Sequence, residues 1–138
     1  MLEEVIAKAK KYLTAAELEK ITKAYNFAKA AHEGQKRVSG EAYIQHPAEV
    51  ALILTELRQG VETICAAFLH DVVEDTSIPL AQIKKEFGEE TAFLVNGVTK
   101  LTNIKIKSKQ ETQTENVRKM FLAMAEDVRI VFIKLADR

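Results

Sequence analysis

Cysteine, proline and glycine are all scarce in this 138-residue chain, with one, two and five copies respectively. The single cysteine, Cys65, excludes an internal disulfide and is typical of a protein from a reducing compartment. No apolar run approaches the ~18 residues that indicate a membrane span. The N-terminal sequence MLEEVIAKAKKYL does not resemble a signal peptide. We therefore expect a cytoplasmic protein.

An excess of charge of either sign is also absent. Twenty basic and twenty acidic residues cancel, which argues against a general surface for nucleic acid or other polyanions but leaves room for a local basic pocket. The apolar content of 47% and charged content of 29% are ordinary for a globular protein. A chain of this length supports one domain with a hydrophobic core.

Few residues that break helices are present, and apolar residues recur with helical spacing along almost the whole chain. Thr14 followed by Glu17 matches the capping-box pattern that opens a helix. Pro47 suits the first turn of another helix, and Gly34, Gly60 and Gly88 are expected to end helices. The predicted helices cover residues 2–12, 14–33, 47–60, 61–75, 79–88, 89–101 and 110–126.

Two polar segments and one apolar segment complete the pattern. Gln35–Gln45 is predicted to be a polar loop and Thr102–Lys109 a basic loop. Val128–Ala136 is rich in β-branched residues and could form a strand, but no convincing partner strand exists. We favour a buried helix, and the predicted fold class is all-α.

The segment Ala66–Asp75, AAFLHDVVED, carries the densest group of chemically active side chains. On a helix, His70, Asp71, Glu74 and Asp75 fall within an arc of about 140°. The opposite, apolar face carries Cys65, Ala66, Leu69, Val72 and Val73. Charged groups beside an apolar stretch are seldom buried unless they are paired or bind a metal. This face therefore indicates a metal site or an acid/base site, with a solvated helix face as the less favoured alternative.

Two distant residues extend the same chemistry. His46 precedes Pro47, and Asp137 follows the apolar segment 128–136. With His70 and Asp71 they form a set of nitrogen and oxygen ligands suited to Mn, Fe or Zn. Purely structural roles stay open for both residues. His46 also suits a helix cap, and Asp137, on spacing alone, suits a surface position. The lysines around Lys105 are most simply a solvated loop, with phosphate binding as the minority alternative.

Four motifs of the chain resemble those of a known family. From about Tyr12 to Arg138, the chain is similar to the N-terminal HD-type hydrolase domain of the RelA/SpoT (Rel) alarmone family. The motifs that carry the resemblance appear in the family's order, namely AHEGQKRVSGEAYIQHPAEVA, AAFLHDVVEDT, FGEETAFLVNGVTKL and ENVRKMFLAMAEDVRIVFIKLADR.

The resemblance implies an all-helical HD fold that binds one Mn²⁺ ion. It implies hydrolysis of the 3′-pyrophosphate of (p)ppGpp to GDP or GTP and pyrophosphate. Glu74 and Asp75 match the acidic pair of hydrolase-competent members, and Arg37 matches the basic residue that stacks on guanine. Ser39 is a further candidate for contact with the nucleotide. The implied metal ligands are His46, His70, Asp71 and Asp137.

Departures from the family pattern are few. Ala42 and Gly60 stand where the family usually has proline and aspartate, and both lie outside the metal set. The family continues LADR into LHNMRT and further helices, so we expect residues 1–138 to be a partial, C-terminally truncated HD domain. We expect the parent to be a longer, bifunctional protein with synthetase and regulatory domains. The 138-residue piece alone is expected to be inactive, because Asp137 lies one residue from a fraying end.

Two alternatives to an alarmone hydrolase stay open. One is an HD-type phosphohydrolase of another nucleotide, and the other is a regulatory domain that binds nucleotide without turnover. The intact Glu74–Asp75 pair disfavours the second.

Overall fold

The computed structural model of the chain describes residues 2–33, 44–102, 117–118 and 127–137, and every regular element in these ranges is helical. The helices are α1 (Leu2–Ala9), α2 (Ala15–Ala31), α3 (Gln45–Glu56), α4 (Val61–Asp75), α5 (Leu80–Phe87), α6 (Glu89–Thr102) and α8 (Val128–Ala136). The all-α prediction is confirmed, and so is the choice of helix over strand for residues 128–136. Of the predicted helix 110–126, only Val117 and Arg118 are described, and both are helical.

Local sequence signals set several helix ends, and those at Thr14 and Gly88 are as predicted. Thr14 caps α2 in a complete capping box with Glu17, which satisfies backbone donors that the first turn leaves unpaired. Gly88 ends α5 with a φ of 96°, a backbone conformation that residues with a Cβ seldom adopt. Asp127 caps α8 by accepting a hydrogen bond from the backbone N–H of Arg129.

The prediction that Gly60 ends a helix is wrong. α3 ends at Glu56, and the left-handed residue that reverses the chain after it is Arg58, with a φ of 54°. Gly60 instead precedes α4 as its N-terminal cap residue, in an extended conformation with a φ of −70°. A glycine at a junction of two helices fits either role, and here the chain turns two residues earlier.

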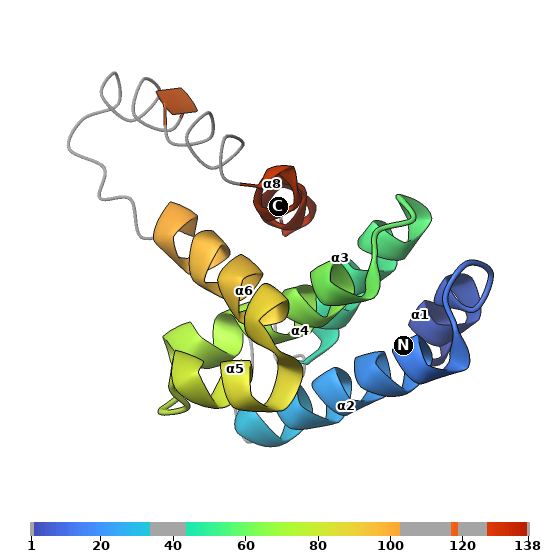
Figure 1. The fold of residues 1–138 in the computed structure, drawn as a ribbon, viewed down its shortest axis with the longest axis horizontal. Helices are drawn as coiled ribbons and strands as arrows, with labels where there is room; N and C mark the ends of the chain where they lie inside the picture. The colour runs from blue at the N-terminus through green and yellow to red at the C-terminus, as the bar shows by residue number, and fades with distance from the viewer. Residues whose placement is uncertain (1, 34–43, 103–116, 119–126, 138) are drawn as a thin grey trace.

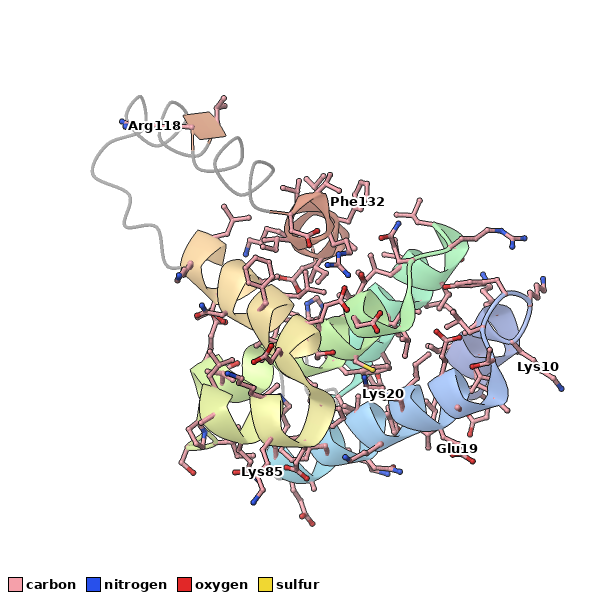
Figure 2. The ribbon with its side chains drawn as sticks, viewed as in Figure 1. Lys10, Glu19, Lys20, Lys85, Arg118 and Phe132 are labelled. Carbon is pink, nitrogen blue, oxygen red and sulfur yellow. The ribbon has the colours of Figure 1, made fainter. Side chains whose placement is uncertain are left out.

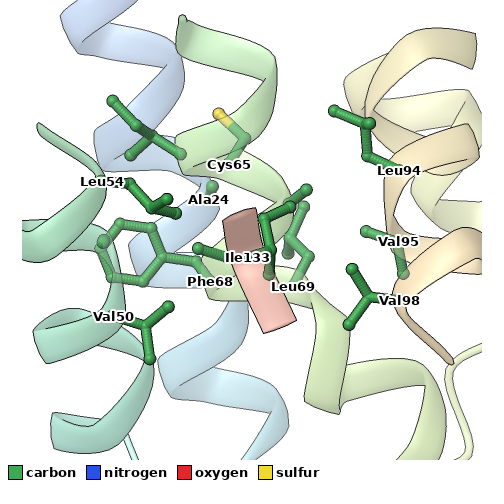
Figure 3. Close-up of a cluster of buried hydrophobic side chains, with 14 of the residues drawn as sticks. Ala24, Val50, Leu54, Cys65, Phe68, Leu69, Leu94, Val95, Val98 and Ile133 are labelled. Atoms are coloured by element: carbon green, nitrogen blue, oxygen red, sulfur yellow. The ribbon is translucent and has the colours of Figure 1, made fainter. Parts of the chain in front are cut away.

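Helix α4 lies at the centre of the molecule, where it packs against α2, α3, α6 and α8 (Figure 1). Ten of its fifteen residues are buried, as expected of a helix enclosed on most sides. Phe68 is fully buried and meets Tyr25 of α2 edge-to-face, with ring centroids 5.7 Å apart. Around it, aliphatic side chains from α3, α4, α6 and α8 fill the core (Figure 3). This packing fixes which face of α4 is left for polar residues.

Helix α8 closes one side of the core by lying against α6, α3 and α4 (Figure 1). It lies close to α6 at Gly97, where a Cβ would be 2.2 Å from Ile130 Cδ1. Next to Ile130 in the sequence, Arg129 joins the cap residue Asp127 to Glu90 of α6, with Nη1 2.6 Å from Glu90 Oε1. These contacts set the position of α8, and hence of the residue that follows it.

Charged side chains lie on the outside of the molecule, as Glu19 of α2, Lys85 of α5 and Lys10 in the turn after α1 illustrate (Figure 2). Within the described ranges, no helix combines the length and apolar character needed to cross a membrane.

Candidate metal centre

The four polar residues in the second half of α4, namely His70, Asp71, Glu74 and Asp75, lie on one face of the helix, as the sequence predicts, but they differ sharply in exposure. His70 is buried, with 1% of its surface exposed. Asp71 and Glu74 are partly buried, whereas Asp75 at the helix end is exposed. The inner end of this face is therefore shielded from water and the outer end is open.

The ring orientation of His70 is set by its own helix. Its Nδ1 lies 2.8 Å from the carbonyl oxygen of Ala67. Because a carbonyl only accepts hydrogen bonds, Nδ1 must carry a proton and donate the hydrogen bond to Ala67. The neutral ring then presents the lone pair of Nε2 to the site, which is the arrangement found in histidines that bind metals.

Asp137, just beyond α8, lies beside the same two residues of α4. His70 Nε2 lies 3.2 Å from Asp71 Oδ1 and 3.6 Å from Asp137 Oδ1. The ligand atoms of these three residues all lie within 4.8 Å of one another. Two helices that are distant in sequence thus bring three donors together.

His46 approaches this group from the first turn of α3. Its Nε2 lies 2.5 Å from Asp137 Oδ1. The next two residues, Pro47 and Ala48, are buried and anchor this turn in the core. His46 therefore joins the group through Asp137, which links the two imidazoles, and it lies outside the three residues whose ligand atoms all approach within 4.8 Å of one another.

The donor set fits a divalent cation. Metal–ligand bonds to histidine and carboxylate are about 2.0–2.2 Å long, so neighbouring donors around one ion stand about 3 Å apart. The spacings at His70 are close to this value. In addition, His70 Nε2 is buried without a hydrogen bond. A buried acceptor beside two carboxylates costs free energy unless a proton or a cation lies between them.

Electrostatics within the group follow from burial and pairing. Burial raises the pKa of Asp137, but the imidazoles of His70 and His46 outweigh this effect and lower it to about 2. Burial acts to lower the pKa of His70, yet Asp137 and Asp71 hold it above its ordinary value. The metal-free site thus favours a proton on His70, in the place where a cation would bind.

Glu74 has a different environment from the four donors. Burial raises the pKa of this carboxyl, with Asp71 adding to the effect, while His70 and Lys134 oppose it. Its Oε1 atom is buried and makes no hydrogen bond. A carboxyl with a raised pKa beside a metal group is suited to accept and return a proton.

Other predicted site residues lie outside the described residues. These are Arg37, Ser39 and the lysines around Lys105. The sequence patterns did not single out Lys134, whose side chain lies on the site. The available signal was its spacing, because it precedes Asp137 by three residues and so shares its face of the chain.

Comparison with known families decides the class of this fold. The family model described as HD domain matches residues 24–138. The chain belongs to the HD domain family. The histidine–aspartate pair of this HD domain, His70 and Asp71, stands on the central helix α4.

The resemblance to the RelA/SpoT family is also confirmed. The chain is 49% identical over 130 residues to the guanosine-3′,5′-bis(diphosphate) 3′-pyrophosphohydrolase of Vibrio cholerae, and this match covers 94% of the chain. It is 49% identical over 127 residues to the bifunctional (p)ppGpp synthase/hydrolase SpoT of Escherichia coli, covering 92% of the chain. The HD domain described here spans only 18% of the length of each of these relatives.

A solved structure shares the fold. It is that of a metazoan ortholog of SpoT, a protein that hydrolyses ppGpp and plays a role in starvation responses. The match has a TM-score of 0.68 and 29% sequence identity, and it covers 91% of this chain and 67% of that one.

Proposed function

We propose that this HD domain, within its natural protein, hydrolyses the 3′-pyrophosphate of (p)ppGpp to GDP or GTP and pyrophosphate. The observation that carries the proposal is a cluster of four side chains. Asp137 contacts both His46 and His70, and His70 also contacts Asp71. The identity of about 49% to 3′-pyrophosphohydrolases over more than nine-tenths of the chain supports the choice of substrate.

Four residues would hold one divalent ion, with Mn²⁺ as the family's expected metal: His46, His70, Asp71 and Asp137. When bound, such an ion lowers the pKa of a water molecule and offsets negative charge on the phosphate. The carbonyl of Ala67 keeps His70 Nε2 available by accepting a hydrogen bond from the Nδ1–H group. Asp137, with its pKa lowered to about 2, stays ionised at neutral pH and so remains a ligand.

Glu74 supplies the proton transfer in this proposal. Its carboxylate accepts a proton from the attacking water as the water oxygen bonds to the phosphorus attached to the 3′-oxygen. The bond between that phosphorus and the 3′-oxygen breaks, and Glu74 returns the proton to the leaving 3′-oxygen. Asp75, exposed at the end of α4, assists from the solvent side by orienting water.

The nucleotide contacts rest on the family resemblance alone. Arg37 stacks on the guanine base, because a planar guanidinium suits an aromatic face. Ser39 contacts the nucleotide from the same segment. We also propose a cytoplasmic location and a longer parent protein that carries synthetase and regulatory domains, as the length of the relatives suggests.

The test is release of pyrophosphate from ppGpp by the full-length natural protein with Mn²⁺, compared with release of phosphate from GTP. The proposal expects pyrophosphate release that requires the metal and that Asp137→Ala abolishes. Turnover of GTP at the same rate would favour a phosphohydrolase of another nucleotide. Binding of ppGpp without any turnover would favour a regulatory domain.

A further inference from the structure

Lys134 places a positive charge at the edge of the metal centre. It lies on α8 one turn before Asp137, and its Nζ is 3.9 Å from Asp137 Oδ2. Its side chain is 27% exposed, so the ammonium is neither enclosed in the core nor fully in solvent. The same ammonium acts on Glu74 across the site, because it is one of the two cations that oppose the raised pKa of that carboxyl.

A substrate that carries a pyrophosphate meets a strongly negative surface here. Asp71, Glu74 and Asp137 gather on one side of α4 and α8. One divalent ion offsets only part of their charge, and a pyrophosphate adds several negative charges of its own. Repulsion between like charges at this spacing costs free energy in a partly buried site. A cation beside the carboxylates would therefore favour entry of the polyanion.

We propose that Lys134 binds a non-bridging oxygen of the substrate's pyrophosphate beside the metal centre. This inference rests on the proposed function for the identity of the substrate. At 3.9 Å, the contact between Nζ and Asp137 Oδ2 exceeds hydrogen-bond length. An ammonium has three donors on a flexible stem and binds phosphate as a point charge. Lys134 can thus keep its attraction to Asp137 while it donates to an anion in the site.

A purely structural role for Lys134 has different consequences. If the ammonium served only to hold Asp137 in place, its loss would weaken metal binding. If it binds pyrophosphate, its loss leaves metal binding unchanged or tighter, because one positive charge near the ion is gone. Metal affinity and pyrophosphate affinity therefore separate the two roles.

The experiment uses Lys134→Gln and Lys134→Arg in the full-length natural protein. Lys84→Gln is the matched control, since it removes the same charge from an exposed ion pair with Glu89 on α5 and α6. Calorimetry measures binding of Mn²⁺ alone and of inorganic pyrophosphate in the presence of Mn²⁺. Asp137→Ala is the reference variant. The part of the pyrophosphate binding that it removes is assigned to the metal centre. Kinetics measure KM and kcat for ppGpp.

Lys134→Gln should weaken pyrophosphate binding and raise KM by about tenfold to a hundredfold, the usual range for a lost charge-assisted hydrogen bond. Its Mn²⁺ affinity should not fall, Lys134→Arg should recover most of the loss, and Lys84→Gln should behave as wild type. Unchanged pyrophosphate affinity in Lys134→Gln would overturn the inference, and so would a loss of Mn²⁺ binding. If the natural protein does not turn over ppGpp at all, the proposed function fails, while pyrophosphate binding still tests Lys134.

Discussion

His46 Nε2 lies 2.5 Å from Asp137 Oδ1, although the two residues are 91 positions apart in the sequence. This contact joins the start of α3 to the end of α8 and closes the polar face of α4 between them. His70 lies on that face with its Nε2 3.6 Å from the same Asp137 oxygen. One carboxylate oxygen therefore stands between the two imidazoles, and the integrity of the site depends on it.

The first prediction concerns this carboxylate. Asp137→Ala should abolish measurable Mn²⁺ binding, because it removes the donor that links His46 to His70 and Asp71. Calorimetric titration with Mn²⁺ measures the effect, and circular dichroism checks that the helices remain. Glu89→Ala, at the exposed start of α6, is the control. It removes a carboxylate whose side chain is 84% exposed, so stability should change by less than about 1 kcal/mol and Mn²⁺ should still bind. Equal Mn²⁺ affinity in Asp137→Ala and wild type would refute the ligand assignment.

The second prediction separates proton transfer from metal binding. Glu74→Gln keeps the shape of the side chain but removes its capacity to accept a proton. Turnover of ppGpp should fall by about 10²–10⁴, the range typical of a lost general base, with Mn²⁺ affinity retained. Asp75→Asn should slow turnover by less than about tenfold, because charges exposed to solvent are screened. If Glu74→Gln retained full activity, the role given to Glu74 would be wrong.

The third prediction is the pH dependence of metal binding. Burial opposes the charge on His70, but Asp137 and Asp71 hold its pKa above the ordinary value of 6.5. Without metal, the protonated ring stabilises the folded site at pH values below the pKa of histidine in the unfolded chain. This contribution is lost as the pH rises through the raised pKa of the folded state. A metal needs the unprotonated Nε2. Affinity for Mn²⁺ should therefore rise between about pH 6 and about pH 8, with release of protons.

Calorimetry in buffers of different ionisation enthalpy measures both the affinity and the protons released. Asp137 does not contribute to this change, because its pKa of about 2 keeps it ionised throughout the range. An affinity that is constant across the range would mean that His70 does not bind the ion through Nε2.

The fourth prediction concerns the contact that positions α8. In Gly97→Ala, the added Cβ would lie 2.2 Å from Ile130 Cδ1 and 2.8 Å from Cγ1. Overpacking of this kind costs about 1–3 kcal/mol, partly offset by the better helix propensity of alanine, about 1 kcal/mol. Ile130→Val removes Cδ1 and should make Gly97→Ala less destabilising by about 1 kcal/mol, a normal coupling for residues in contact.

Denaturant unfolding of the four proteins in this double-mutant cycle gives the coupling free energy. Gly97→Ala should also weaken Mn²⁺ binding, because a shifted α8 moves Asp137. The same loss of stability in both backgrounds would show that Gly97 and Ile130 do not constrain each other.

Some helix boundaries could be predicted and others could not. The capping box of Thr14 and Glu17 and the glycine end at Gly88 follow from hydrogen bonds and backbone freedom within a few residues. The end of α3 does not, because the chain reverses at Arg58, which has no special preference for the left-handed conformation. Tertiary contacts hold it there, including the hydrogen bond from the Tyr12 hydroxyl to the carbonyl of Gln59.

The candidate site divides in the same way. Periodicity alone places His70, Asp71 and Glu74 on one helical face, and the structure confirms it. Spacing alone favours a surface position for Asp137, and only its match to a family motif adds it to the metal set. No local pattern indicates that Lys134 faces Glu74, because that relationship depends on how α8 crosses α4.

By itself, the sequence determined that this protein is all-helical, where most of its helices begin, and which face of α4 is polar. These features depend on interactions between residues a few positions apart, so a linear pattern encodes them. Only the tertiary structure decided that His46, His70 and Asp137 meet, and that Lys134 stands beside them. The reason is that their separation depends on helix packing, including the close approach of Ile130 to Gly97 where α8 lies against α6.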